Sequence, residues 1–121
     1  MKLFVDDKQK PPDQTWNVVR TAKDAIEFIR GTEIARKIPN LCPFDHELEI
    51  LSLDHDLGQE ETGYSVALWL ESAVHLRGMI PPKVLKVHSA NPVGRARILQ
   101  SFQSIARYCE RNGMQIPQIE G

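Results

Sequence analysis

Polar side chains suited to metal or phosphate chemistry follow three short apolar runs, at residues 3–5, 51–53 and 84–87. In chain order they are Asp6, Asp7, Asp54, His55, Asp56, His88, Ser89 and Asn91. If the three runs are parallel strands of one sheet, these side chains meet at the carboxyl edge, where open α/β sheets bind ligands. The spacing therefore predicts a functional site at that edge.

The carboxylates of this set would repel one another strongly unless a cation lay among them. An all-oxygen group of Asp6, Asp7, Asp54 and Asp56 suits Mg²⁺ or another hard divalent ion such as Mn²⁺. Asp is also a common turn former, so a solvated turn is the simpler interpretation for any one of these residues taken alone. The occurrence of both pairs favours a metal site.

The two imidazoles, His55 and His88, could supply a general acid and a general base for phosphoester chemistry. A single histidine at a strand end is more often a packed or hydrogen-bonded residue. Alternation along the strand also places His55 on the opposite side from its neighbours. The case for a direct role in proton transfer therefore rests more on His88 than on His55.

A helix start follows the third apolar run. Asn91 suits the N-cap position and Pro92 the first helical position. The backbone N–H groups of such a first turn favour anions, and phosphate in particular. We expect Ser89, Asn91 and Arg95 to bind phosphate, with Arg95 able to do so in bidentate fashion. The alternative, in which Asn91 only caps and the arginine is solvated, is the preferred interpretation for Arg97.

The elements that must position these residues alternate between strand-like and helix-like patterns, which predicts a parallel sheet with helices packed on its faces. The expected strands cover residues 2–6, 16–20, 48–53 and 84–88, with a short edge strand near 115–116. The expected helices run from 21 to about 31 with a restart through 38, from 62 to 78, and from 91 to 113. The segment between the first two strands is too short for the usual helical crossover. We expect an irregular loop or a degenerate turn of helix there.

Length and composition are those of one globular domain spanning residues 1–121, with a formal net charge of −1. This charge argues against a surface built mainly for nucleic-acid backbones. The two cysteines, Cys42 and Cys109, have no metal-ligand spacing, so we expect two ordinary thiols. No apolar stretch approaches the ~20 residues of a membrane helix, and the N-terminus does not resemble a signal peptide. We expect a cytoplasmic protein without a membrane partner.

The three signature stretches resemble those of response-regulator receiver domains. They are Leu3-Phe4-Val5-Asp6-Asp7, Leu53-Asp54-His55-Asp56-Leu57-Gly58 with Gly63 beyond it, and Val87-His88-Ser89-Ala90. The resemblance implies a receiver-like, flavodoxin-like three-layer α/β sandwich with a parallel sheet of four to five strands and helices on both faces. It also implies that Asp54 is the phosphoacceptor, Asp6 and Asp7 bind the metal, and Ser89 is the switch hydroxyl.

A closer resemblance is to the divergent group described as cyclic-phosphate processing receiver domains. Its residues are Asp54-His55-Asp56-Leu57-Gly58, Thr62-Gly63-Tyr64 and His88-Ser89-Ala90-Asn91-Pro92-Val93-Gly94-Arg95, within a similarity that covers about residues 2–108. The resemblance implies handling of cyclic phosphate ends, for example in RNA repair. No lysine occurs after Lys86, so the lysine that receivers place after a fifth strand has no counterpart.

Two classes of function follow as hypotheses. The first is a metal-dependent phosphoesterase, a hydrolase acting on 2′,3′-cyclic phosphates of RNA ends or nucleotides. In it Asp6, Asp7 and Asp54 hold the ion and His88 transfers a proton, while Asp54 is alternatively a nucleophile. The second is a non-catalytic module that binds a phosphorylated ligand or partner, or an aspartyl phosphoacceptor; the missing lysine counts against the phosphoacceptor.

Overall fold

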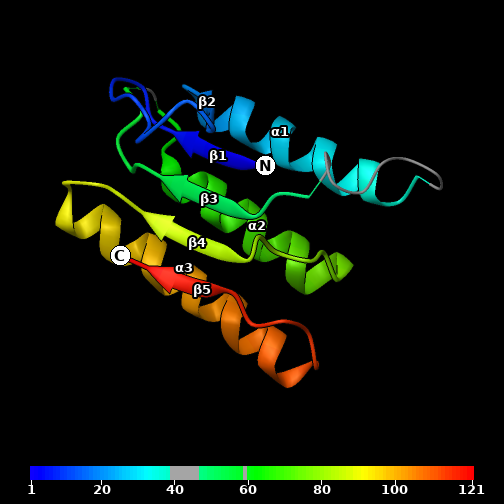
Figure 1. Ribbon diagram of the computed structural model, residues 1–121. Coiled ribbons are helices and arrows are strands. Elements are labelled where there is room, and N and C mark those ends of the chain that lie inside the picture. The colour runs from blue at the N-terminus through cyan, green and yellow to red at the C-terminus, as the bar shows by residue number, and fades with distance from the viewer. Residues whose placement is uncertain (39–46, 59) are drawn as a thin grey trace.

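The computed structural model describes residues 1–38, 47–58 and 60–121. Cys42 lies outside these residues, whereas Cys109 is a free, buried thiol, as expected. The elements, in chain order, are β1 (Lys2–Val5), β2 (Asn17–Val19), α1 (Ala22–Arg36), β3 (Ile50–Leu53), α2 (Gly63–Arg77), β4 (Val84–Val87), α3 (Pro92–Arg111) and β5 (Gln118–Glu120). Figure 1 shows them as one sheet with three helices behind it.

The sheet has five strands in the order β2-β1-β3-β4-β5, and every neighbouring pair is parallel. This confirms the predicted receiver-like α/β fold. The fifth strand exists, but at Gln118–Glu120 and not at residues 115–116 as predicted. Pro117 stands between the two positions. A proline has no backbone N–H for the ladder, so pairing begins only after it.

All three helices lie in one layer, because α2 packs against both α1 and α3. The chain moves in the same direction along the sheet from β2 to β3, β4 and β5, and right-handed crossovers then place every connecting helix on the same face. The sequence predicts helices on both faces of the sheet, whereas the three helices of the described residues all cover one face. The connection from β1 to β2 runs in the opposite direction and contains no helix in residues 6–16. It therefore leaves the second face without a helix, consistent with the predicted irregular loop.

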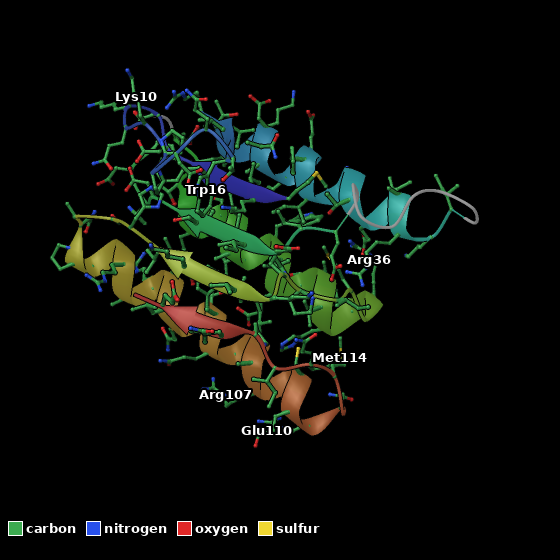
Figure 2. All side chains as sticks on the ribbon, viewed as in Figure 1. Lys10, Trp16, Arg36, Arg107, Glu110 and Met114 are labelled. Carbon is green, nitrogen blue, oxygen red and sulfur yellow. The ribbon has the colours of Figure 1, made fainter. Side chains whose placement is uncertain are left out.

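The apolar side chains that alternate along the central strands form the core against the helices. Leu3 and Val5 of β1 pair with Leu51 and Leu53 of β3, and all four are fully buried. The intervening residues face the other side of the sheet, where the Trp16 ring makes an edge contact with Phe4 at 5.9 Å between centroids. Figure 2 shows Trp16 beside the long N-terminal loop. Trp16 thus partly takes the place of the missing helix.

Helix ends follow the predicted capping residues. Thr21, Thr62 and Asn91 are N-caps, and Gly78 closes α2 in the left-handed conformation with φ of 65°. One boundary differs, because α1 continues without a break to Arg36 and does not stop near Gly31. A glycine in a helix costs only about 1 kcal/mol relative to alanine, which the rest of α1 can offset. Among the described residues, no helix combines the length and apolar character needed to cross a membrane.

Candidate functional site

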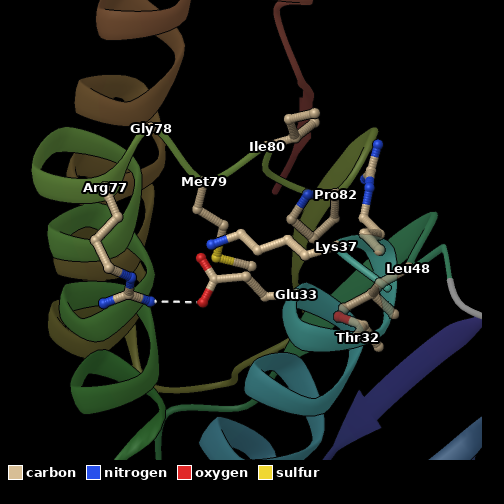
Figure 3. Close-up of a pocket in the computed structure, with 10 residues that line it drawn as sticks. Thr32, Glu33, Lys37, Leu48, Arg77, Gly78, Met79, Ile80 and Pro82 are labelled. Atoms are coloured by element: carbon tan, nitrogen blue, oxygen red, sulfur yellow. Dashed lines mark hydrogen bonds and ion pairs between the residues drawn. The ribbon is translucent and has the colours of Figure 1, made fainter. Parts of the chain in front are cut away.

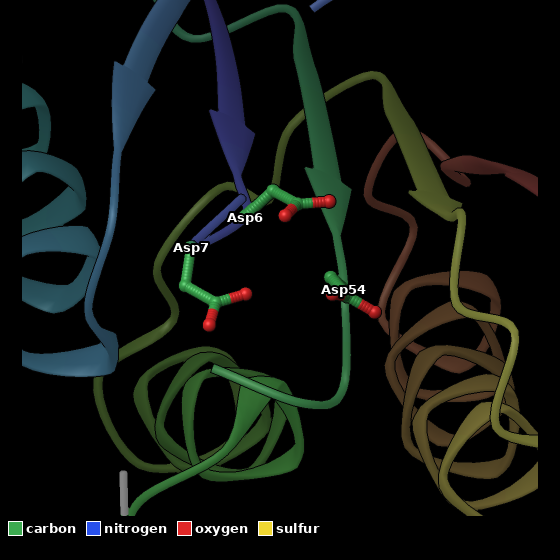
Figure 4. A group of neighbouring side chains, drawn as sticks. All are labelled: Asp6, Asp7 and Asp54. Atoms are coloured by element: carbon green, nitrogen blue, oxygen red, sulfur yellow. The ribbon is translucent and has the colours of Figure 1, made fainter. Parts of the chain in front are cut away.

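Three carboxylates meet at the carboxyl edge of the sheet. Asp6 and Asp7 follow β1 and Asp54 follows β3, and each offers an oxygen within 4.8 Å of the other two (Figure 4). The adjacent parallel strands end in register, with Val5 opposite Leu53, so the residues that follow them must come together. Asp56, predicted as a fourth ligand, does not belong to this cluster. We call Asp6, Asp7 and Asp54 the carboxylate cluster.

Asp6 is buried and rigidly held. Its Oδ1 accepts hydrogen bonds from the backbone N–H groups of Lys8 and Gln9, both at 2.9 Å, and its Oδ2 lies 3.0 Å from Nε2 of His88. Burial acts to raise the pKa of Asp6, but the donors of Gln9, Lys8 and His88 outweigh it and hold the pKa below the usual value. Asp6 therefore stays ionised in the folded protein.

The pKa of Asp54 shifts in the opposite direction from that of Asp6. Burial and, after it, the negative charge of Asp6 raise the pKa of Asp54, although the Ser89 hydroxyl and His88 counteract part of this. The Asp7 carboxylate lies against the turn at Gly58, where an added Cβ would be 2.8 Å from its Oδ2. The raised pKa of Asp54, beside two further carboxylates, shows that the negative charges of the cluster are not fully balanced by positive charge. The cluster therefore fits a hard divalent cation, which all-oxygen ligand sets prefer.

His88 is held between two partners and does not project into solvent. Its Nδ1 lies 2.7 Å from the Ser52 hydroxyl, and its ring stacks on Phe4 with centroids 4.3 Å apart. Because the ionised Asp6 carboxylate can only accept, Nε2–H of His88 donates to it, while Nδ1 is hydrogen-bonded to the Ser52 hydroxyl. Both ring nitrogens are thus engaged, so this geometry suits the positioning of Asp6 better than free proton exchange with a substrate.

His55 belongs to a separate group at the start of α3. Its Nδ1 is 2.9 Å from Oδ1 of Asp56, and the Asn91 side-chain amide donates to the same oxygen at 3.3 Å. The ring packs directly on Gly94, where an added Cβ would lie 2.2 Å from it. His55 and Asp56 therefore lie apart from the carboxylate cluster, consistent with the predicted alternation. The hydrogen bond to His55 and, to a smaller extent, that from Asn91 hold the pKa of Asp56 below its usual value.

The turn between β3 and α2 depends on Gly63. The Gly63 N–H donates to the His55 carbonyl at 2.9 Å, and an added Cβ would lie only 1.9 Å from the Asp54 carbonyl oxygen. This close approach brings the start of α2 back against the end of β3. Gly63 thus fixes the backbone that carries both Asp54 and His55.

The predicted phosphate-binding residues have different environments. Ser89 is buried, and its oxygen accepts from the Asn91 N–H at 3.1 Å. The Asn91 side chain accepts from the N–H groups of Val93 and Gly94, which were expected to face phosphate. The capping interpretation of Asn91 therefore holds, and these N–H groups already have an acceptor.

Arg95, in the first turn of α3, is exposed at the surface. An added Cβ at Gly121 would be 3.2 Å from one of its guanidinium nitrogens, so in this structure the group points towards the end of β5. Within residues 1–38, 47–58 and 60–121, Arg95 forms no ion pair. Arg97, predicted to be solvated, lies 6.0 Å over the Tyr64 ring.

Three residues of the site were not identified from the sequence. Ser52 is the one polar residue in an apolar strand, a signal that it needs a buried partner, which is His88. Gly94 allows the His55 ring to lie directly against α3, because any side chain at position 94 would collide with the ring. The Arg20 guanidinium donates to the carbonyls of Asp6 and Gln9 and so holds the loop that follows β1; a surface arginine gives no such signal in the sequence.

Comparison with known proteins identifies a family. Residues 1–104 match the family model described as the cyclic-phosphate processing receiver domain. Searches of curated proteins and of solved structures found no significant match. The matched residues extend from β1 into α3 and include every site residue described above.

Proposed function

The chain belongs to the cyclic-phosphate processing receiver domain family, and on this premise we propose that it is a metal-dependent phosphoesterase that opens cyclic phosphates. The substrate class is a 2′,3′-cyclic phosphate, at an RNA end or on a nucleotide. The observation that carries the proposal is the carboxylate cluster at the carboxyl edge of a parallel sheet. Such processing of RNA ends or nucleotides would belong in the cytoplasm and could serve RNA repair.

In this proposal Asp6, Asp7 and Asp54 hold Mg²⁺ or Mn²⁺. The bound ion would supply positive charge for a phosphoryl oxygen and for the charge that develops in the transition state. Asp6 is prepared for this role, because its pKa is lowered and its carboxylate is fixed by three hydrogen bonds. Asp54 is the ligand most dependent on the cation, because without it burial and Asp6 disfavour its charge.

The remaining polar residues have supporting roles. The Ser89 hydroxyl, which lies close enough to Asp54 to lower its pKa, would donate to the phosphate. Arg95 is exposed and would reach the phosphate by rotating away from Gly121. We assign His88 to the positioning of Asp6 through its Nε2–H, and Ser52 to the orientation of His88. His55, oriented by Asp56, is the residue left for proton transfer to a leaving oxygen at the start of α3.

The activity test uses a short RNA oligonucleotide ending in a 2′,3′-cyclic phosphate, incubated with Mg²⁺ or Mn²⁺ and with EDTA. We expect metal-dependent conversion to a monoester end, lost by at least about a hundredfold in Asp54→Ala because an anchoring charge disappears. Asp13→Ala is the matched control, since Asp13 is an exposed loop carboxylate that does not belong to the cluster. Unchanged turnover in Asp54→Ala, or none by folded, metal-bound wild type, would reject the phosphoesterase.

The products also separate the two roles open to Asp54. If Asp54 is a nucleophile, its attack on phosphorus breaks one ring P–O bond and leaves the RNA joined to Asp54 through the remaining ribose–phosphate bond, so a covalent protein–RNA adduct accumulates under single-turnover conditions and is cleaved by hydroxylamine. If it is a metal ligand, no adduct forms while the cyclic ester is opened. Phosphorylation of Asp54 by a small phosphodonor such as acetyl phosphate, without any opening of the cyclic ester, would instead indicate an aspartyl phosphoacceptor.

A further inference from the structure

A cavity lies at the opposite end of the sheet from the carboxylate cluster. It has a volume of about 370 Å³ and is formed by the C-terminal end of α1, the C-terminal end of α2 and the segments that lead into β3 and β4 (Figure 3). This volume lies in the range of small-molecule sites, which is roughly 300–1,000 Å³. We call it the α1–α2 pocket; its lining includes Glu33, Arg36, Lys37, Leu48, Arg77 and Met79.

The buried carboxylate of Glu33 is incompletely satisfied. Its Oε1 accepts from the Arg77 guanidinium at 2.8 Å, and its side chain is only 10% exposed. Its Oε2 is buried and, among the described residues, has no hydrogen-bond partner. Leaving a buried acceptor of this kind without a donor destabilises the folded protein. Since Glu33 lines the pocket, the missing donor can come from a molecule bound there.

The rim of the pocket is positively charged. Arg36 and Lys37 are exposed at its mouth, and Arg77 lies between Glu33 and the Trp69 ring, 5.6 Å from the ring centroid. One carboxylate therefore faces three cations, so the site as a whole favours an anion. Its deeper wall is apolar and contains Leu48 and Met79, both buried.

We propose that the α1–α2 pocket binds a small molecule of the nucleoside monophosphate class. The apolar wall would hold the base, Oε2 of Glu33 would accept from an N–H or O–H group of the base or ribose, and Arg36 and Lys37 would bind the phosphate. This site would be separate from the carboxylate cluster, and the proposal does not depend on the phosphoesterase activity. A nucleotide bound there would bridge α1, α2 and the segment that leads into β4.

The test is isothermal titration calorimetry with AMP, GMP, CMP and UMP, in EDTA so that no divalent ion supports binding at the carboxylate cluster. Adenosine and inorganic phosphate are the probe controls, because each keeps only half of the expected contacts. Fluorescence in a Trp16→Phe background gives a local readout, since Trp69 then remains the only tryptophan and contacts Arg77.

We expect one nucleotide to bind at a 1:1 ratio, with affinity lowered at least about tenfold in Glu33→Gln and in the rim variant Arg36→Glu/Lys37→Glu. The rim variant keeps the test valid if Glu33→Gln fails to fold, because both substituted side chains are exposed. Asp54→Asn should bind as wild type does. Binding lost in Asp54→Asn but kept in the pocket variants, or no binding of any nucleotide at about 1 mM, would overturn the proposal.

Discussion

Gly94 and His55 are in closer contact than any other residue at position 94 would permit. A Cβ added to Gly94 would lie 2.2 Å from Cγ of the His55 ring and 2.6 Å from Nδ1. The same Nδ1 is bound to Asp56, which the Asn91 amide also contacts. One glycine in the first turn of α3 therefore determines where the His55–Asp56 pair lies.

Substitution of this glycine should destabilise the fold although alanine is the better helix former. We expect Gly94→Ala to lower the free energy of unfolding by about 1–3 kcal/mol in urea denaturation, since the His55 ring must move or the helix must shift. The matched control is Gly31→Ala in α1, where nothing lies within 4 Å of the added Cβ. It should raise the free energy of unfolding by roughly 0.5–1 kcal/mol. Stabilisation by both substitutions would disprove the close contact at Gly94.

Removal of the Ser52 hydroxyl should affect stability through His88. Ser52→Ala leaves Nδ1 of His88 without its hydrogen-bond partner in a partly buried setting, which should cost about 1–2 kcal/mol of unfolding free energy. Ser104→Ala is the control, because its hydroxyl donates to Glu71 at the half-buried junction of α2 and α3. We expect a loss of only about 0.5 kcal/mol there. Equal losses would show that the Ser52–His88 bond has no special role.

Neutralisation of Asp54 should stabilise the protein when no divalent ion is present. The pKa of Asp54 is raised above 3.8, so its charge costs stability once the pH exceeds the folded pKa. Asp54→Asn should therefore stabilise by on the order of 0.5 kcal/mol at pH 7, a small value because the side chain is partly solvated. The gain should vanish near pH 3, because the Asp54 side chain of the wild type is then protonated and as uncharged as the asparagine of the variant. A destabilised Asp54→Asn at pH 7 in EDTA would contradict the repulsion.

The acid stability of the protein should depend on Asp6 with the opposite sign. Its pKa lies below 3.8, so its contribution is complete above that pH and is lost as the pH falls through the folded value. Asp6→Asn should reduce the unfolding free energy by about 1–2 kcal/mol at pH 7 and flatten its decline in the acid range. Denaturation curves at several pH values measure both effects. An unchanged acid slope in the variant would exclude this role for Asp6.

The sequence predicted the carboxylate cluster because the positions of parallel strand ends follow from the order of the elements. Asp6, Asp7 and Asp54 meet as expected from this rule. Asp56 could not be placed in the same way, since it lies beyond the strand in a turn whose path is set by Gly63 and by the Asn91 amide. The Asn91 contact joins residues 35 positions apart along the chain, which hydropathy and capping patterns do not reveal.

The partners of His88 could likewise not be predicted from the sequence. The sequence predicts that His88 transfers a proton, but it does not reveal that Ser52 and Asp6, 36 and 82 residues away along the chain, bind its two nitrogens. Hydropathy and capping patterns contain no information on such pairs. The one-sided helical layer is different, because it follows from strand order and crossover handedness, and the strand order is not visible in a single sequence.

The most direct test of the site is the binding of Mn²⁺ measured by electron paramagnetic resonance at pH 7, in wild type and in single Asn variants of Asp7, Asp54 and Asp56. We predict one site in the wild type, at least tenfold weaker binding (~1.4 kcal/mol) in Asp7→Asn and Asp54→Asn, and unchanged binding in Asp56→Asn. Binding that survives in Asp54→Asn but is lost in Asp56→Asn would contradict the assignment of the metal site to the carboxylate cluster.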